Sequence, residues 1–121
     1  DIMPTLADIA GVNLKKSDIP TEGISLLPTL KAQTKRQKQH NYLYWEFHEG
    51  TTSHQAVRSG DWKAVRMDPD GFIELYNLRD DPAEKVNVAS AHPQLASRMK
   101  ATMDKAREHH ELWPLKAASN K

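Results

Sequence analysis

The spacing of hydrophobic residues changes from helical to alternating near residue 41. Before that point, Ile2, Leu6 and Ile9 recur at intervals of four and three, which predicts a helix over residues 1–10 that ends at Gly11. An apolar cluster around Pro28 predicts one further turn of helix. These two short helices cannot enclose a core by themselves, so this part of the chain must lie on a larger body.

Residues 42–78 have the pattern of β-strands. Tyr42–Phe47 is rich in aromatic residues and alternates between two sets of side chains, which predicts a strand with both faces available for burial. Turns at Gly50, Gly60 and Gly71 separate three further predicted strands, 55–58, 62–67 and 72–78, and both Gly60 and Gly71 are expected to adopt positive φ. Consecutive strands with short connections predict an antiparallel meander.

A long helix is predicted to begin near Pro93. Its apolar residues form one stripe that would cover a face of the sheet: Leu95, Met99, Met103 and Ala106. Trp113 and Leu115 are expected to hold the end of this helix. The expected fold class is therefore α+β, with a four-stranded antiparallel sheet packed with a long C-terminal helix and preceded by short linking helices.

Composition indicates a domain that relies on other protein for part of its packing. Only 38% of the 121 residues are hydrophobic and the net charge is +1. The chain contains no cysteine, which excludes a disulfide scaffold, a cysteine zinc site and a cysteine nucleophile. No apolar run reaches the ~20 residues of a membrane span, and no signal peptide pattern opens the chain. Because the first residue is Asp1, we expect a processed protein or a piece of one.

A basic stretch separates the two parts of the chain. Lys31, Lys35, Arg36 and Lys38 lie in a segment that has no acidic residue, which predicts a solvated connection between residues 1–40 and 41–121. Such a stretch could alternatively bind a sulfated polysaccharide. Nucleic acid is not expected as a partner, because interleaved aromatic residues and nucleic-acid motifs are missing.

Five tracts, in order, resemble the formylglycine-dependent sulfatases of the alkaline-phosphatase superfamily. They are Asp1–Gly11, Gly23–Pro28, Leu43–Glu46, Ala56–Lys63 and Glu74–Asn87. The resemblance implies that residues 1–40 are linking helices and a basic loop from a missing catalytic domain. It also implies that residues 41–121 are the sulfatase C-terminal subdomain. The N-terminal catalytic domain of the same parent chain is then the expected partner, and the parent is expected to be periplasmic or secreted.

The resemblance implies a parent that hydrolyses sulfate esters, often on sugars, with a formylglycine and a calcium ion. The formylglycine motif, Cys/Ser-x-Pro-x-Arg, does not occur in this chain: the nearest tract, Ser17–Thr21, has its proline one position late and lacks the arginine. The family's paired-Asp metal motif is also missing, and Asp80–Asp81 matches a turn instead. We therefore assign no catalytic or metal residue here, and expect calcium and formylglycine in the missing catalytic domain. The chain alone is expected to be inactive.

The end of the aromatic strand supplies candidates for substrate contact. Because the family's subdomain packs beside the active-site mouth, His48, together with Glu46, Glu49 and His54, could contact a sulfated carbohydrate. The alternative is a solvated hairpin loop. Metal binding is not expected, because Thr52 stands where a zinc-binding helix motif would need its second histidine, and the adjacent His109 and His110 diverge.

Other polar and aromatic residues have structural interpretations. Trp45, Trp62, Tyr44 and Tyr76 could stack on sugars but are more simply core or interface residues. Arg58, Asp61 and Lys63 are expected to fix the hairpin or an interface, and Glu84 and Asn87 to form turns. A second hypothesis from another class is a free-standing, non-catalytic binding module for anionic sugars. The coding sequence upstream of Asp1 would distinguish it from a sulfatase fragment.

Overall fold

The computed structural model of the protein describes residues 1–16 and 20–117. Ser17, Asp18 and Ile19, which form most of the tract that partly resembles the formylglycine motif, lie outside the described residues. The chain divides into two compact units, Asp1–His40 and Asn41–Lys121. This division falls where the spacing of hydrophobic residues changes. Each unit is described by itself.

The first unit consists of short helices: α1 (Ile2–Ile9), η1 (Leu14–Lys16), α2 (Leu27–Leu30) and η2 (Thr34–Arg36). Helix α1 ends before Gly11, which adopts a φ of +71° as its predicted role at a helix end requires. Its buried residue is Thr5, whose hydroxyl donates to Asp1 O at 2.7 Å and accepts from Leu26 N at 2.9 Å. Hydrogen bonds therefore connect α1 to the segment that leads into α2.

The apolar residues of α1 are exposed. Ile2 has an exposed fraction of 71%, and Leu6 and Ile9 are each 59% exposed. The predicted helix is thus confirmed, but the face that its spacing marks for burial stays largely exposed among the described residues of the first unit. An apolar stripe of this kind indicates a surface that packs on other protein.

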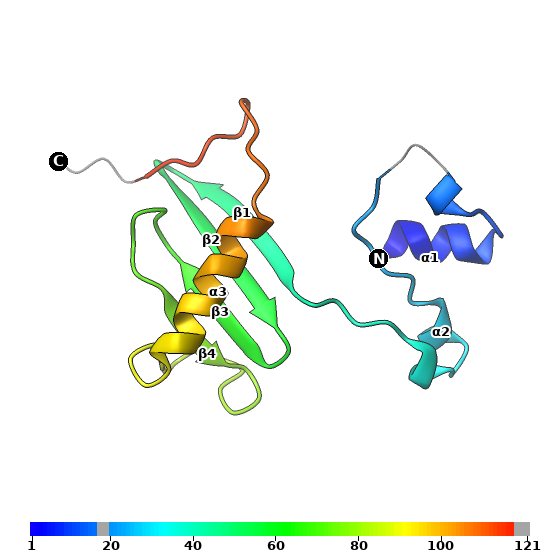
Figure 1. Cartoon of the computed structure of the whole chain (residues 1–121), viewed down its shortest axis with the longest axis horizontal. Helices are drawn as coiled ribbons and strands as arrows, with labels where there is room; N and C mark the ends of the chain where they lie inside the picture. Colours follow the sequence, from blue (N-terminus) through cyan, green and yellow to red (C-terminus); the bar gives the residue numbers. More distant parts are fainter. Residues whose placement is uncertain (17–19, 118–121) are drawn as a thin grey trace. The chain divides into compact units, whose positions relative to one another are not determined.

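The second unit is a sheet covered by one helix (Figure 1). Strands β1 (Leu43–Glu49), β2 (Thr52–Ser59), β3 (Trp62–Arg66) and β4 (Glu74–Asn77) pair in the order β1-β2-β3-β4, each antiparallel to its neighbour. Helix α3 (Pro93–Ala106) lies across one face. The α+β class and the antiparallel meander are confirmed.

The core lies between α3 and this covered face of the sheet. As predicted, the stripe on α3 faces the strands, and Met99 and Met103 are buried together with Ala96. To the hydrophobic core cluster, the sheet contributes one residue from each of three strands: Val57, Ala64 and Leu75. No helix of the described part of the second unit lies over the opposite face, and Trp45 and Phe47 of β1 are 49% and 62% exposed there.

The glycines in the two predicted turns act differently. Gly60 adopts a φ of +58°, as expected for the tight β2–β3 hairpin. Gly71 is not in the left-handed region, so the expectation that it needs positive φ is wrong. It closes a turn by donating from its N–H to Asp68 O at 2.8 Å, and an added Cβ would lie only 3.1 Å from that oxygen. A close backbone approach therefore explains this glycine.

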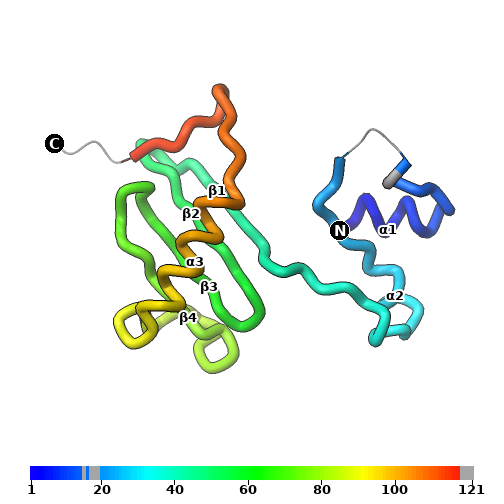
Figure 2. The backbone as a smooth tube through the Cα atoms, in the orientation of Figure 1, coloured from blue at the N-terminus to red at the C-terminus, as the bar shows by residue number. Residues whose placement is uncertain are grey.

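The segment between β4 and α3 makes two tight loops (Figure 2). The side-chain oxygen of Asn87 accepts hydrogen bonds from Leu75 N at 3.1 Å and Ala89 N at 2.9 Å, which fastens the segment to β4. Glu84 has a φ of +54°, which is unfavourable for a residue other than glycine. Both residues form turns, as the sequence predicts. Among the described residues, no helix is long and apolar enough to cross a lipid bilayer.

Candidate functional site

The four candidate residues lie at the β1–β2 end of the sheet, in two pairs on opposite faces. Glu46 and His48 are opposite the buried residues Gln55 and Ser53, so they lie on the face that α3 covers. Glu49 alternates to the open face, and so does His54, which is opposite Phe47. The structure brings Glu46 and His48 together and Glu49 and His54 together. It does not bring all four onto one face.

His48 is packed within the covered face. Its Nδ1 lies 2.8 Å from Ser53 Oγ, and its ring meets the ring of Trp113 edge to face with centroids 4.0 Å apart. The other ring nitrogen, Nε2, is buried without a hydrogen bond and lies 3.5 Å from Glu46 Oε1. The side chain is only 9% exposed. It is therefore shielded from solvent in this chain.

Glu46 belongs to a polar network that runs along the covered face. Its Oε2 accepts hydrogen bonds from the Tyr44 hydroxyl at 2.6 Å and from Arg107 Nε at 3.0 Å. Both members of the Glu46–Arg107 ion pair are nearly buried, with side chains 10% and 13% exposed. Because Arg107 follows α3, this pair ties the end of the helix to β1.

The polar network continues from Tyr44 across the sheet. The Tyr44 hydroxyl accepts from Gln55 Nε2 at 2.7 Å, and the Gln55 side-chain oxygen accepts from Arg66 Nε at 3.0 Å. Arg66 also donates to Asp104 Oδ1 of α3 at 2.9 Å. Buried polar groups thus satisfy one another from β1 to α3, as burial requires. The members of the network are Tyr44, Glu46, Gln55, Arg66, Asp104 and Arg107.

Ionisation within the network follows from burial and neighbouring charges. Burial, followed by the hydrogen bond to Glu46, raises the pKa of Tyr44 to about 12. Burial alone would raise the pKa of Asp104, but the hydrogen bond from Lys100 and the charge of Arg66 outweigh it and lower that pKa. The neutral phenol and the charged carboxylate are therefore the forms that the fold favours.

A C-terminal strap, residues 107–117, covers the edge of this network and is the segment that follows α3 in Figure 1. Arg107 donates to Trp113 O at 2.9 Å. Ser53 N donates to Lys116 O at 2.8 Å, and Lys116 N donates to Ser53 Oγ at 2.8 Å. The sequence predicts that Trp113 holds the end of the helix. Its carbonyl accepts the hydrogen bond from Arg107, the residue after α3, and its ring packs on His48 of β1. The strap is what shields His48.

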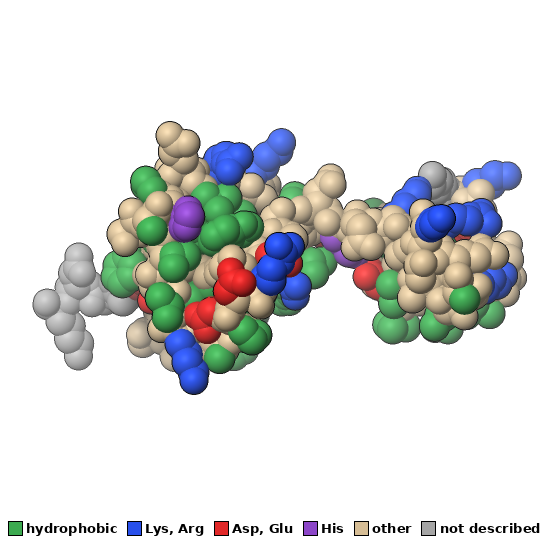
Figure 3. Space-filling model, turned by 90° about the horizontal axis from the view of Figure 1, so that it is seen from below, with side chains coloured by type: hydrophobic (Ala, Val, Ile, Leu, Met, Phe, Trp, Pro, Cys, Tyr) green, Lys and Arg blue, Asp and Glu red, His purple; other side chains and the backbone are tan. Residues whose placement is uncertain are grey.

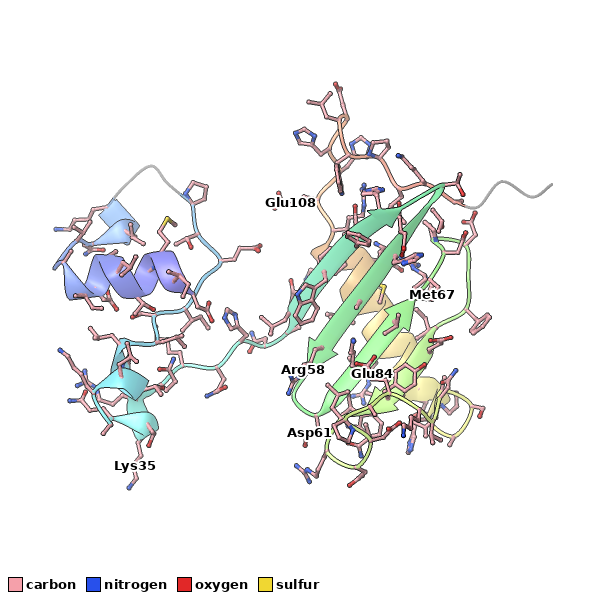
Figure 4. All side chains as sticks on the ribbon, turned by 180° about the vertical axis from the view of Figure 1, so that it is seen from behind. Lys35, Arg58, Asp61, Met67, Glu84 and Glu108 are labelled. Carbon is pink, nitrogen blue, oxygen red and sulfur yellow. The ribbon has the colours of Figure 1, made fainter. Side chains whose placement is uncertain are left out.

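The open face carries a groove of about 670 Å³. Its lining comes from the sheet and from the segment after β4: Trp45, Ala56, Arg58, Lys63, Leu78, Pro82 and Glu84. Figure 4 views the sheet from this face, and Arg58 and Glu84 are labelled there. Lys63 Nζ contacts both carboxylate oxygens of Glu84, at 2.7 and 2.8 Å, and Arg58 donates to Gly60 O. Arg58 thus contacts the hairpin, as expected. Arg58 and Lys63 also line this groove.

Glu49 and His54 extend the open face toward its solvent-exposed end. Glu49 has a side chain 70% exposed, and its Oε2 lies 3.7 Å from His54 Nδ1. An exposed carboxylate beside an imidazole can accept and donate hydrogen bonds to a neighbouring ligand. Within residues 1–16 and 20–117, no three His, Asp or Glu side chains are placed to hold a metal ion.

Sequence reasoning overlooked Gln55, Arg66 and Arg107. Alternation along β2 and β3 places Gln55 and Arg66 on the covered face, and two polar residues at core positions indicate a shared hydrogen bond. No comparable signal marks Arg107, because its partner Glu46 is 61 residues away in the sequence.

Comparisons with known proteins point to one group of enzymes. The sequence profile of the family "N-sulphoglucosamine sulphohydrolase, C-terminal" matches residues 1–109. Delta 4,5-hexuronate-2-O-sulfatase of Bacteroides thetaiotaomicron is 37% identical over 95 residues, which are 74% of this chain and 18% of that protein. Arylsulfatase K of Bos taurus is 31% identical over 108 residues, 82% of this chain and 19% of that protein.

Solved structures show the same fold. A sulfatase from Bacteroides thetaiotaomicron has a TM-score of 0.76 at 29% identity, covering 98% of this chain and 27% of that one. A 2-O GAG sulfatase has a TM-score of 0.73, also at 29% identity and with the same two shares covered. The chain therefore spans about a fifth of the curated relatives that it matches and about a quarter of these solved chains.

The Glu46–Arg107 ion pair should be important for stability. Glu46→Gln removes the charge that faces a nearly buried guanidinium, and we expect the free energy of unfolding to fall by about 2 kcal/mol. Glu49→Gln, the matched change at an exposed carboxylate on the same strand, should alter it by less than about 0.5 kcal/mol. Urea unfolding of the two variants measures both values. Equal losses would show that the pair contributes nothing specific.

The raised pKa of Tyr44 predicts a loss of stability at alkaline pH. The folded state favours the neutral phenol, with a pKa of about 12 against about 10 when unfolded. This contribution is complete below pH ~10 and is lost as the pH rises through ~12. Tyr44→Phe removes the group that titrates, so its unfolding free energy should decline less steeply over that interval. Urea unfolding across this pH range tests the prediction, and equal slopes for wild type and variant would contradict it.

Proposed function

Because this chain belongs to the N-sulphoglucosamine sulphohydrolase C-terminal family, we propose that it is the C-terminal part of a sulfatase whose remaining chain hydrolyses sulfate esters. The observation that carries the proposal is the family match over residues 1–109. The chain spans only about a fifth of its sulfatase relatives, which supports its being a part of such a protein. One of these relatives is named a hexuronate-2-O-sulfatase, and one of the solved structures is that of a 2-O GAG sulfatase, which supports a sulfated carbohydrate as substrate.

The chemical step belongs to the part of the parent that precedes this chain. The sequence contains neither a cysteine nor a Ser-x-Pro-x-Arg tract that could become formylglycine. The described residues also provide no set of three ligands for a metal ion. We therefore place the formylglycine and the calcium ion in the catalytic domain, and assign this chain a structural and substrate-facing role.

The two exposed apolar surfaces are the features that fit such a role. One is the α1 stripe formed by Ile2, Leu6 and Ile9; the other is the β1 side of the open face, formed by Leu43, Trp45 and Phe47. Large apolar side chains gathered on one face of an element are typical of surfaces that pack on other protein. We infer that both surfaces pack on the catalytic domain of the parent.

The two pairs of candidate residues then have different roles at the β1–β2 end of the sheet. Glu49 and His54 are on the open face and can reach a ligand, so we propose that they contact the substrate. Glu46 and His48 are nearly buried beneath the C-terminal strap, so we propose that they position the end of β1. His48 could reach a substrate only if the strap moved away from it.

The groove on the open face favours a second candidate function. Trp45, half exposed, and the guanidinium of Arg58 line it together, and an aromatic ring beside a cation can hold an anionic sugar. A free-standing module that binds such sugars is the alternative. The reading frame upstream of Asp1 distinguishes the two, since a Cys/Ser-x-Pro-x-Arg motif is expected only in a sulfatase.

Activity measurements test the proposed function. We expect the full-length parent to release sulfate from a sulfated oligosaccharide, and the 121-residue chain alone to release none. In the parent, Glu49→Gln combined with His54→Ala should raise KM about tenfold for the oligosaccharide, the loss expected for two exposed hydrogen bonds, and leave a small aryl sulfate unaffected. Sulfate release by the chain alone, or a parent without activity, would overturn the proposal.

A second prediction concerns the open face. In the parent, Trp45→Ser with Phe47→Ser should lower the thermal midpoint by several degrees, because two buried rings are lost at the interface. In the 121-residue chain the same change should alter the unfolding free energy by about 0.5 kcal/mol or less, since both rings are exposed there. Leu112→Ser, at a residue 86% exposed, is the control in both proteins. Equal effects of the double change in both proteins would exclude an interface.

A further inference from the structure

The basic stretch of the first unit is a closed loop. Residues 23–45 contain no Asp or Glu, and four cations fall within residues 31–38: Lys31, Lys35, Arg36 and Lys38. All four are exposed, and among the described residues none of them forms an ion pair. Figure 4 labels Lys35 at the outer end of this loop. Their charge is therefore available to a ligand.

The side chain of Gln37 holds the loop closed. Its oxygen accepts from Thr29 Oγ1 at 2.7 Å and Thr29 N at 3.3 Å, and its Nε2 donates to Ser25 O at 3.0 Å and Lys38 O at 3.1 Å. One amide thus joins both ends of residues 25–38. The backbone of the basic loop is fixed before any ligand binds, which reduces the entropy lost on binding.

The backbone within the loop is held in an unfavourable conformation. Ala32 has a φ of +56°, in the left-handed region that a residue with a Cβ rarely adopts. Hydrogen bonds from Ala32 N to Thr29 O at 3.0 Å and from Gln33 N to Pro28 O at 2.8 Å enclose it. These two bonds form a Schellman motif, in which the residue that follows the C-cap of a helix adopts the left-handed conformation. This helix end fixes the backbone where the basic loop begins.

We propose that the basic loop, residues 31–38, binds the sulfate groups of an anionic polysaccharide. Four exposed cations on a fixed backbone attract a chain of closely spaced anions more than any single anion. Residues 1–40 contain no Phe, Trp or Tyr, so the unit lacks the large aromatic rings on which nucleic-acid bases usually stack. The choice of a sulfated chain rests on the proposed function.

The charge of this unit is unevenly distributed over its surface. Figure 3 shows Lys and Arg side chains over one edge of the first unit and hydrophobic side chains over another. A polyanion at the charged edge would leave the hydrophobic edge uncovered. The two edges of the unit can therefore serve different partners.

Heparin, as a highly sulfated probe, tests the proposal on the 121-residue chain. Lys31→Gln, Lys35→Gln and Lys38→Gln together should weaken heparin affinity about tenfold, because each exposed ion pair contributes a factor of about two. The control combines Lys85→Gln, Lys105→Gln and Lys116→Gln, three exposed lysines of the second unit, which change the net charge equally. Isothermal titration at several salt concentrations gives the affinities. An equal loss in both variants would overturn the proposal, because net charge alone would then explain binding.

A second comparison keeps the net charge constant. Gln37→Ala opens the loop and should weaken heparin affinity several-fold, whereas Gln39→Ala, at an exposed neighbour, should not. Circular dichroism verifies that both variants retain wild-type helix and strand content. Single-stranded RNA of equal charge that binds as tightly as heparin would reject a preference for sulfated chains. Because no turnover is measured, loss of heparin binding and failure of the sulfatase proposal are separate results.

Discussion

The structure of the second unit depends on the packing of one helix, α3, against one face of the sheet. Met99 and Met103 of α3 pack against Val57, Ala64 and Leu75, and this cluster is its apolar core. A single helix cannot cover both faces of a four-stranded sheet. The polar network therefore forms along the covered face, where burial forces side chains to pair. The groove and the exposed rings of β1 lie on the face that has no layer over it.

The order and type of the elements could be predicted because their signals are local. The alternation in β1 and the four-residue spacing of the α3 stripe need no distant partner to be recognised. Local patterns do not tell what packs on an element, however. The stripe on α1 has helical spacing, yet Ile2, Leu6 and Ile9 are exposed. Likewise, pairing Glu46 with Arg107 requires knowing that α3 crosses the sheet.

The candidate site illustrates how sequence proximity differs from proximity in a sheet. Glu46, His48, Glu49 and His54 fall within nine residues, but the two-residue period of a strand assigns them to opposite faces. The basic loop shows the converse. Its charges are evident from the sequence, whereas the fixed backbone that presents them depends on Gln37, an uncharged residue that composition does not mark.

Among residues 1–16 and 20–117, strand β1 pairs only with β2 and is therefore an edge of the sheet. Its seven residues leave backbone groups unpaired along one side, and Leu43, Trp45 and Phe47 make the same strand apolar on its open face. An edge with both properties is a template for adding a further strand from another molecule. An edge that stays uncovered therefore favours self-association through β1, and contacts that cover it would also protect the protein from aggregation.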